Sequence, residues 1–465
     1  MTEQVAIAAR GLNGVAEAGF TPAYRRYALI MLTVVYTTNY VDRQILSILL
    51  QPIKMELHLS DTQLGFLGGI AFAIFYATLG IPIAMWADRS NRRNIIALAL
   101  TIFAGMTAVC AFVQSFTQLA LARIFVGVGE AGSSPPSHSM IADMYPPEKR
   151  GAALGVFSLG VNIGILIGFL TGGWVAQWYG WRTAFLTVGF PGLLVAAIVR
   201  LTLREPPRGH ADGIADTADA PGVLAVFRFL WGQRSFRHIS FGAALFAFVG
   251  YGAVVWLPAF LSRSFHMAPG AIGTSLALII GISGGLGTYI GGRLGDRLGK
   301  RDVRWNLWAT AIVWIGVVPF QVWLYTSLDS GTSACLYTYV AAGGQPACGL
   351  SQDALKALAI FIVPAFAGAY YLAPGLAMTQ ALVTLRMRSV ASAILLFILN
   401  IIGLGLGPQS VGILSDQLAP HFGAESLRYA LLASSAMGVW GAVHFIIGAR
   451  SLKADIERAR LHGLR

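Results

Sequence analysis

Long apolar stretches follow one another along almost the whole chain, and they constrain its fold more than any other feature. A membrane-crossing helix needs about 20 mostly apolar residues, and twelve stretches of roughly that length are separated by short polar segments. They cover residues 25–52, 61–86, 94–114, 117–142, 151–178, 182–203, 237–262, 270–294, 305–326, 356–384, 389–415 and 427–449. The sequence therefore predicts an all-α, polytopic membrane protein with 12 transmembrane helices.

The composition argues against the soluble classes of protein. Hydrophobic residues make up 56% of the 465 residues and charged residues 12%, whereas roughly 25% of the residues in a typical soluble protein are charged. The net charge of +12 is spread over short clusters between apolar stretches, so we expect no nucleic-acid partner. We find no phosphate-binding loop, no serine-hydrolase elbow and no metal-ligand cluster, and we therefore expect no enzymatic activity, no cofactor and no metal.

The basic residues predict the orientation in the membrane. Cytoplasmic loops carry an excess of Lys and Arg, and most of the 33 basic residues lie on one side if the amino terminus is cytoplasmic. Lys54, Arg182, Arg263, Lys356 and Arg428 fall on the opposite side. We therefore expect both termini in the cytoplasm. Because arginine greatly outnumbers lysine, we expect a bacterial inner membrane, and we expect a monomer.

Two of the three cysteines share one polar loop. Cys335 and Cys348 lie between the ninth and tenth stretches, on the side predicted to face away from the cytoplasm. A disulfide persists in such an oxidising compartment, and we favour it over two free thiols. Cys110 lies inside an apolar stretch and is predicted to be an inert core residue.

The chain reads as two halves of six helices each. A polar stretch rich in Pro and Asp predicts a cytoplasmic linker at residues 204–236, between a first half at 1–203 and a second half at 237–465. An Asp-Arg-x-x-basic pattern follows the second helix of each half, as Asp88-Arg89-Ser90-Asn91-Arg92-Arg93 and as Asp296-Arg297-Leu298-Gly299-Lys300-Arg301. Matching loops in two halves are typical of a duplicated transporter.

These loops resemble the signature of the major facilitator superfamily, as does Arg123-x-x-x-Gly127-x-Gly129 in the fourth helix. Ala84 and Asn91 stand where that signature usually has glycines. A narrower resemblance to the spinster family, whose members are linked to sphingolipids and lysophospholipids, is carried by Asn39-Tyr40-Val41-Asp42-Arg43, Gly127-Val128-Gly129-Glu130-Ala131 and Ile141-Ala142-Asp143-Met144-Tyr145. The resemblance implies two bundles that rock about a central site.

Four charged residues lie inside predicted helices. Asp42 and Arg43 are in the first helix, and Arg123 and Glu130 are in the fourth. Such charges cost about 2.5–3.5 kcal/mol at a helix centre, so they are functional candidates. In the resembled fold these helices are neighbours at the cavity, and we interpret the four residues as a site for proton coupling and substrate. A static ion network that holds the two helices together is the alternative.

A second group of charges lies at the predicted cytoplasmic boundary. The resemblance implies that Asp88, Arg89, Arg92, Asp143 and Asp296 form a cytoplasmic gate, with Arg92 or its neighbour pairing with Asp143. The alternative is that these residues only set the topology, because positive charge is expected there in any case.

The expected cavity has two unlike walls. The first half supplies the charges, whereas the second half supplies mainly aromatic and apolar residues. The residues expected to line the cavity, besides the four charges, are Asn39, Ser134, Tyr251, Trp256, Tyr370 and Asn400. Aromatic residues in membrane helices also serve simply as packing, and that reading stays open for each one.

Two patterns concern the backbone. Gly160, Gly164, Gly168 and Gly172 recur every four residues, which predicts close helix packing or, alternatively, a sliding hinge between the halves. Pro135 and Pro136 remove backbone donors just after Glu130, which predicts a break in the fourth helix.

Together these features predict a proton-coupled secondary transporter that moves an amphiphilic, lipid-like substrate by alternating access. One alternative is a proton symporter for small organic anions such as sugar acids, in which Arg43 and Arg123 would bind a carboxylate. A membrane-embedded lipid enzyme or a receptor that does not transport is a further alternative, which the duplicated Asp-Arg loops disfavour.

Overall fold

A computed structural model describes residues 20–87, 89–208, 222–326, 334–340, 346–384 and 387–463 of the chain. Nearly all of these residues are helical. The first half contains α2 (Pro22–Leu57), α3 (Asp61–Gly68), α4 (Ile70–Ala87), α5 (Arg92–Val109), the 3₁₀ turn η1 (Cys110–Phe112), α6 (Phe116–Ala131), α7 (Ser134–Met144) and α8 (Pro147–Thr202).

The second half follows a short helix in the predicted linker, α9 (Val223–Trp231). Its elements are α10 (Arg234–Phe265), α11 (Pro269–Gly299), α12 (Trp305–Thr326), β1 (Cys335–Val340), β2 (Pro346–Ser351), α13 (Gln352–Tyr370), α14 (Leu372–Ala381), α15 (Arg388–Leu399), the π-helical segment η3 (Asn400–Leu406), α16 (Gly407–Phe422), the 3₁₀ turn η4 (Gly423–Glu425) and α17 (Ser426–Gly463).

The helices account for twelve membrane spans, some split and some joined. Eight helical runs among the described residues are long and apolar enough to cross a membrane, and those at Pro147–Thr202 and Arg388–Leu461 are each long enough for two spans. Within α8 the two spans meet at Gly180, whose φ of 84° and ψ of 163° break the helix. That positive φ suits glycine because it lacks a Cβ.

The two remaining spans are the ones that carry the intramembrane charges. The first is α2, in which polar and charged residues lower the hydropathy. The other is divided into α6 and α7, and its break lies at Gly132 and Ser133. Pro135 and Pro136 follow in the first turn of α7, where the missing N–H groups cost least. The sequence prediction of a broken fourth helix therefore agrees with this structure.

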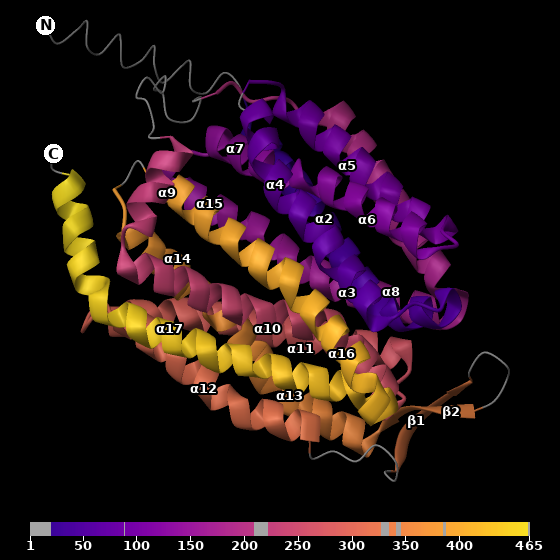
Figure 1. Cartoon of the computed structure of the whole chain (residues 1–465). Helices are drawn as coiled ribbons and strands as arrows, with labels where there is room; N and C mark the ends of the chain where they lie inside the picture. Colours follow the sequence, from indigo (N-terminus) through magenta and orange to yellow (C-terminus); the bar gives the residue numbers. More distant parts are fainter. Residues whose placement is uncertain are drawn as a thin grey trace, which may run out of the picture.

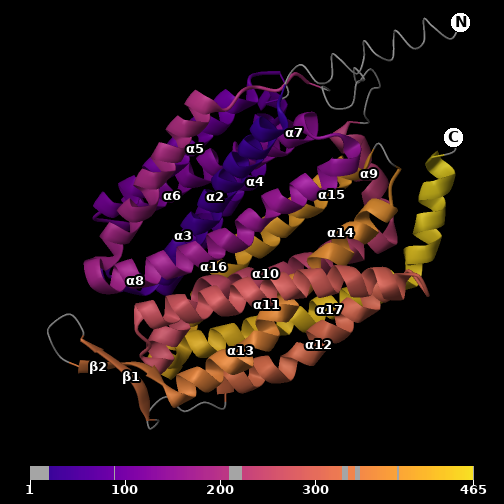
Figure 2. The same cartoon turned by 180° about the vertical axis from the view of Figure 1, so that it is seen from behind.

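The helices form two bundles that lie side by side, and the described ends of the chain lie at the same end of the molecule (Figure 1). The hairpin of β1 and β2 lies at the opposite end, as the reverse view also shows (Figure 2). We call these the terminal end and the hairpin end. The hairpin strands are antiparallel, and Cys335 and Cys348 form a disulfide between them. Cys110 is a buried free thiol.

The glycine stripe of α8 packs directly on α2. A Cβ added to Gly164 would lie 2.5 Å from the Cβ of Tyr40, and one added to Gly168 would lie 2.8 Å from the carbonyl oxygen of Val41. Both helices belong to the first half. The stripe therefore serves packing within one bundle in this structure, and it does not lie between the halves as a hinge would.

Candidate functional site

Two buried ion pairs join α2 to α6. Arg43 donates to Oε1 of Glu130 from Nε at 2.8 Å and from Nη2 at 2.5 Å. Arg123 donates from Nη1 to Oδ2 of Asp42 at 2.7 Å, and the hydroxyl of Thr107 donates to Oδ1 of Asp42 at 2.7 Å. The four predicted charges are therefore brought together, each acid paired with the arginine of the other helix.

The two acids differ in how completely they are bonded. Both oxygens of Asp42 accept hydrogen bonds. Oε2 of Glu130, in contrast, is buried and has no hydrogen-bond partner in the described part of the chain. Since a buried carboxylate is costly unless it is paired and hydrogen-bonded, Glu130 depends on Arg43 far more than Asp42 depends on any single partner.

Aromatic rings surround the guanidinium of Arg43. Its Cζ lies 4.8 Å from the ring centre of Phe72, 4.9 Å from that of Tyr76 and 5.0 Å from that of Tyr40. A cation over aromatic faces is stabilised by the ring quadrupoles. These rings let the arginine stay charged in a site that offers it little water.

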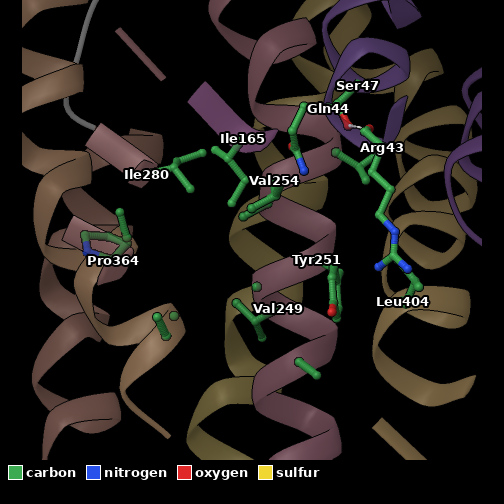
Figure 3. Close-up of a pocket in the computed structure, with 18 of the residues that line it drawn as sticks. Arg43, Gln44, Ser47, Ile165, Val249, Tyr251, Val254, Ile280, Pro364 and Leu404 are labelled. Atoms are coloured by element: carbon green, nitrogen blue, oxygen red, sulfur yellow. Dashed lines mark hydrogen bonds between the residues drawn. The ribbon is translucent and has the colours of Figure 1, made fainter. Parts of the chain in front are cut away.

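A cavity of about 300 Å³ lies between the halves. Figure 3 shows Arg43, Gln44 and Ser47 on one side of it and Ile280 and Pro364 on the other. Among the described lining residues the charged ones are Arg43 and Arg123. The acids Asp42 and Glu130 are not among the lining residues and lie behind their arginines, so the first half presents positive charge to the cavity.

The wall from the second half is largely apolar, with a few polar groups. It is built mainly from α10, α11, α12 and α13, with Leu372 of α14 and Leu404 of η3. Its residues are Ala247, Val249, Gly250, Tyr251, Ala253, Val254, Val255, Ile280, Gly284, Thr288, Trp314, Gln321, Tyr325, Phe361, Pro364, Ala365, Gly368, Ala369, Tyr371, Leu372 and Leu404.

Of the six uncharged residues expected at the cavity, Tyr251 is among those that line it. Trp256 is fully buried and donates from Nε1 to the carbonyl oxygen of Pro408 at 2.8 Å, so it packs inside the second bundle. Tyr370 is also buried, against Gly291, and its neighbour Tyr371 lines the cavity instead. The expectation chose the wrong one of two adjacent tyrosines, because sequence alone does not fix helix rotation.

The three polar residues of this group also lie away from the cavity wall. Asn39 is buried and donates from Nδ2 to Oγ of Ser133 at 2.5 Å, at the break between α6 and α7. Ser134 begins α7, and Asn400 begins the π-helical segment η3. None of these three lines the cavity, so their placement corrects the expectation.

The predicted gate residues do not act as one group here. Arg92 is buried and donates to Asp143, to Oε1 of Glu205 at 2.6 Å and to the carbonyl oxygen of Pro206 at 2.7 Å. These partners all precede the second half. The network thus ties α5 and α7 to the start of the linker, without joining the two bundles.

The other predicted gate residues that the structure describes lie apart from this network. Arg89 and Asp296 are exposed at the terminal end, and Asp88 lies outside the described residues. No group of three or more His, Cys, Asp or Glu side chains in the described part of the chain is arranged to hold a metal ion.

A charged cluster at the hairpin end was missed by the sequence reasoning. Asp61, at the start of α3, accepts from Nη1 and Nη2 of Arg263 of α10 at 2.7 Å each and from Nζ of Lys54 at 2.5 Å. The hydroxyl of Ser415 donates to it at 2.6 Å. Asp416 in turn accepts from the backbone N–H of Asp61 at 3.0 Å. The cluster joins the two halves.

Further contacts close the same end. Trp174 donates from Nε1 to Oγ1 of Thr274 at 3.0 Å, and the side chain of Gln177 accepts from the N–H of Gly270 at 2.9 Å. The halves are thus tied together at the hairpin end.

The sequence carried no signal that Asp61 would contact Arg263 of the other half, because an acid in the first turn of a helix is ordinary.

Comparison with known proteins agrees with this architecture. The family model described as "Major Facilitator Superfamily" matches residues 32–351. The chain belongs to the major facilitator superfamily. Members of that superfamily are transporters and not enzymes, so this chain is an all-α membrane transporter. The resemblance that its loops indicated is therefore confirmed.

Relatives of this chain include an "MFS-type efflux pump" of Mycolicibacterium smegmatis, which is 36% identical over 93% of this chain and 95% of the relative. Spinster homolog 1 of Homo sapiens is 26% identical over 96% of this chain and 84% of the relative. A solved bacterial homolog of the human lysosomal transporter spinster, described as inward-facing and unoccupied, is 31% identical with a TM-score of 0.82, covering 94% of this chain and 99% of that one.

Proposed function

We propose that this transporter couples protons to the movement of an amphiphilic, lipid-like substrate by alternating access. Transport itself follows from the family; the coupling ion and the substrate class are the proposal. The observation that carries it is the two-sided cavity, in which Arg43 and Arg123 line one wall and a largely apolar wall of the second half faces them.

The two walls suit the two ends of an amphiphile. A phosphate or other anionic head would meet the guanidinium groups, which are well matched to such groups. A hydrocarbon tail would lie along Val254, Ile280 and Pro364, where it stays out of water; each Å² of apolar surface exposed to water instead would cost about 25 cal/mol. The relative described as an efflux pump supports export as the direction.

Competition for Arg43 provides the proposed coupling step. An anionic head that draws Arg43 away from Glu130 leaves a buried carboxylate without its cation. Such a group is stable when it takes up a proton and becomes neutral. Glu130 is therefore the proposed proton carrier, and Asp42 with Arg123 holds the neighbouring charges in place.

The conformation fits one step of such a cycle. The polar contacts at the hairpin end tie the halves together there. We propose that the hairpin end faces the periplasm and the terminal end the cytoplasm of a bacterial inner membrane, in line with the basic residues and the disulfide. The structure then represents an inward-facing state, in line with the similar structure described as inward-facing, and we propose that the transporter works as a monomer.

Reconstitution of the Glu130→Gln variant into proteoliposomes tests the coupling. The glutamine keeps the shape of the side chain but carries no titratable proton. Accumulation driven by a pH gradient should fall at least tenfold, while exchange of substrate down its own gradient continues. Gradient-driven accumulation at the wild-type rate would overturn the role given to Glu130. Glu56→Gln, which changes an exposed acid outside the cavity, is the control.

A substrate comparison in the same vesicles tests the substrate class. A fluorescent lysophospholipid should be moved and should compete with other single-chain amphiphiles, whereas a sugar acid should do neither. The two cavity arginines also fit a small organic anion. Movement of the sugar acid, without movement of the lysophospholipid, would favour that symporter function and refute the lipid proposal.

A further inference from the structure

A second groove lies outside the central cavity, between α5 and the last third of α8. Its volume is about 460 Å³, and its lining residues are Asn94, Ala97, Leu98, Thr101, Leu193, Ala196, Ala197 and Arg200. Each helix contributes four positions with the spacing i, i+3, i+4, i+7, which is one face of a helix. The groove therefore runs along both helices for about 10 Å, at 1.5 Å per residue.

Deeper in the membrane than the groove, the two helices are in close contact. A Cβ added to Gly189 would lie 2.7 Å from the Cβ of Ala108, and one added to Gly192 would lie 2.6 Å from the Cβ of Ala104. Glycine and alanine bring the backbones together at that level. One or two turns further on, Ala97, Ala196 and Ala197 line the groove, with Ala97 and Ala196 buried and Ala197 exposed.

The groove faces the bilayer. Large apolar side chains beside it are exposed, among them Leu98, Leu194 and Leu201, which are 49%, 63% and 81% exposed. In a membrane protein such a surface is covered by lipid. The occupant of the groove is therefore drawn from the surrounding leaflet, which is the inner one in the orientation proposed above.

Polarity changes along the groove in the way a phospholipid requires. Its deeper part is bounded by Leu193, Ala196, Ala197 and Thr101, whose hydroxyl donates to the carbonyl oxygen of Ala97 at 2.8 Å, while Arg200 and Asn94 stand at its mouth at the terminal end. Within the described residues, the guanidinium of Arg200 makes no hydrogen bond or ion pair. Arg93 lies beside the mouth and donates from Nε to Oδ1 of Asn94 at 3.1 Å.

Glu205, the acid near this mouth, is held by groups other than the guanidinium groups at the mouth. Glu205 accepts from Nε of Arg92 at 2.6 Å and from the backbone N–H of Arg93 at 2.9 Å. Arg93 contacts Glu205 through its backbone and Arg200 is not among its partners, so neither guanidinium group at the mouth is paired with this acid. Anionic lipids of the inner leaflet attract such clusters by about 1 kcal/mol per basic residue.

We propose that this groove is a binding site for an anionic glycerophospholipid, distinct from the transport cavity. The phosphate lies at Arg200 and Asn94, and one acyl chain lies along the alanines between α5 and α8. Bound there, the lipid fills the space between the third and sixth spans on the bilayer side of the first bundle. The site does not depend on which substrate the central cavity carries.

Native mass spectrometry of the full-length protein, titrated with phosphatidylglycerol or with phosphatidylcholine of the same chain length, tests this site. Wild-type protein should retain at least one phosphatidylglycerol more tightly than phosphatidylcholine. Arg200→Ala should weaken phosphatidylglycerol retention about tenfold. Arg450→Ala, which removes another exposed arginine at the terminal end, should leave it unchanged.

A second variant separates the acyl chain from the charge. Ala197→Phe fills the exposed groove and keeps Arg200, so it should weaken phosphatidylglycerol retention while leaving thermal stability in detergent near that of the wild type. Inorganic phosphate should not compete. Equal retention of both lipids by the wild type, an equal loss in Arg450→Ala, or full retention in Ala197→Phe would each overturn the proposal.

Discussion

At the residue scale, the two ion pairs between α2 and α6 place four charges in a buried site without leaving either acid unpaired. Desolvating a charge costs several kcal/mol, and a buried pair recovers this through its partner and further hydrogen bonds. Asp42 has both an arginine and a threonine hydroxyl, whereas Glu130 has one arginine. The charge of Glu130 therefore depends on one arginine, whereas that of Asp42 is stabilised by two partners.

Removing one member of the better-bonded pair should therefore be costly. Arg123→Met leaves Asp42 buried with Thr107 as its remaining partner, and should destabilise the protein by about 3–5 kcal/mol. Thermal unfolding in detergent measures this loss as a lower melting temperature. Arg297→Met, at an exposed position, is the control. An equal melting temperature for the two variants would contradict the prediction that the Asp42–Arg123 pair stabilises the fold.

At the scale of elements, the contact between α2 and α8 depends on small residues. Gly160, Gly164, Gly168 and Gly172 face α2, and their added Cβ atoms would lie within 3 Å of atoms of that helix. Without a hydrophobic driving force between helices in lipid, such close packing is a main source of association. The glycine stripe therefore holds α2, with its two charged residues, against α8.

A leucine within the glycine stripe should destabilise the protein, whereas a leucine at a glycine outside the stripe should not. Gly164→Leu meets Tyr40 and the carbonyl oxygen of Thr37 and should destabilise the protein by about 1–3 kcal/mol through overpacking. Gly155→Leu lies on the same helix in open space and should be neutral or slightly stabilising, since glycine is a poor helix former. Thermal unfolding compares the two, and equal destabilisation would contradict the packing role.

At the scale of the whole molecule, the hairpin end holds the two bundles together. The charges of Asp61, Arg263 and Lys54 come from both halves and are largely shielded from solvent. Alternating access requires these contacts to break when that end opens. The cluster therefore biases the equilibrium between conformations without touching the central cavity.

Neutralising this acid should shift the conformational equilibrium. Asp61→Asn loses the pairing with Arg263, and the population open at the hairpin end should rise at least tenfold, which corresponds to about 1.4 kcal/mol. Spin labels at Gln114→Cys and His421→Cys, which are exposed positions in the two halves, report the opening. The distance between the two labels is measured by double electron–electron resonance. The native cysteines interfere little, because two form a disulfide and Cys110 is buried.

The label experiment has a matched control at the same end. Glu56→Gln removes an acid that pairs with Arg182 inside the first half, so it should leave the distance distribution unchanged. A distribution for Asp61→Asn that matches the wild type would show that the cluster does not hold the halves closed.

Much of the architecture was predictable because it depends on local composition. Runs of about 20 apolar residues specify membrane helices wherever they occur, since no other backbone arrangement except a closed barrel satisfies its hydrogen bonds in lipid. The prediction of twelve spans and of the superfamily is confirmed. The costly charges at Asp42, Arg43, Arg123 and Glu130 were also visible, because an ionisable residue inside an apolar run stands out by itself.

The sequence alone therefore determined that the chain is a helical membrane transporter and which charges lie within its helices. The tertiary structure decided which arginine pairs with which acid, that the arginines and not the acids line the cavity, and that Tyr371 rather than Tyr370 reaches it. It also decided that Asp61 meets Arg263. These outcomes depend on helix rotation and on contacts between residues hundreds of positions apart, which packing of the whole molecule sets and no local pattern encodes.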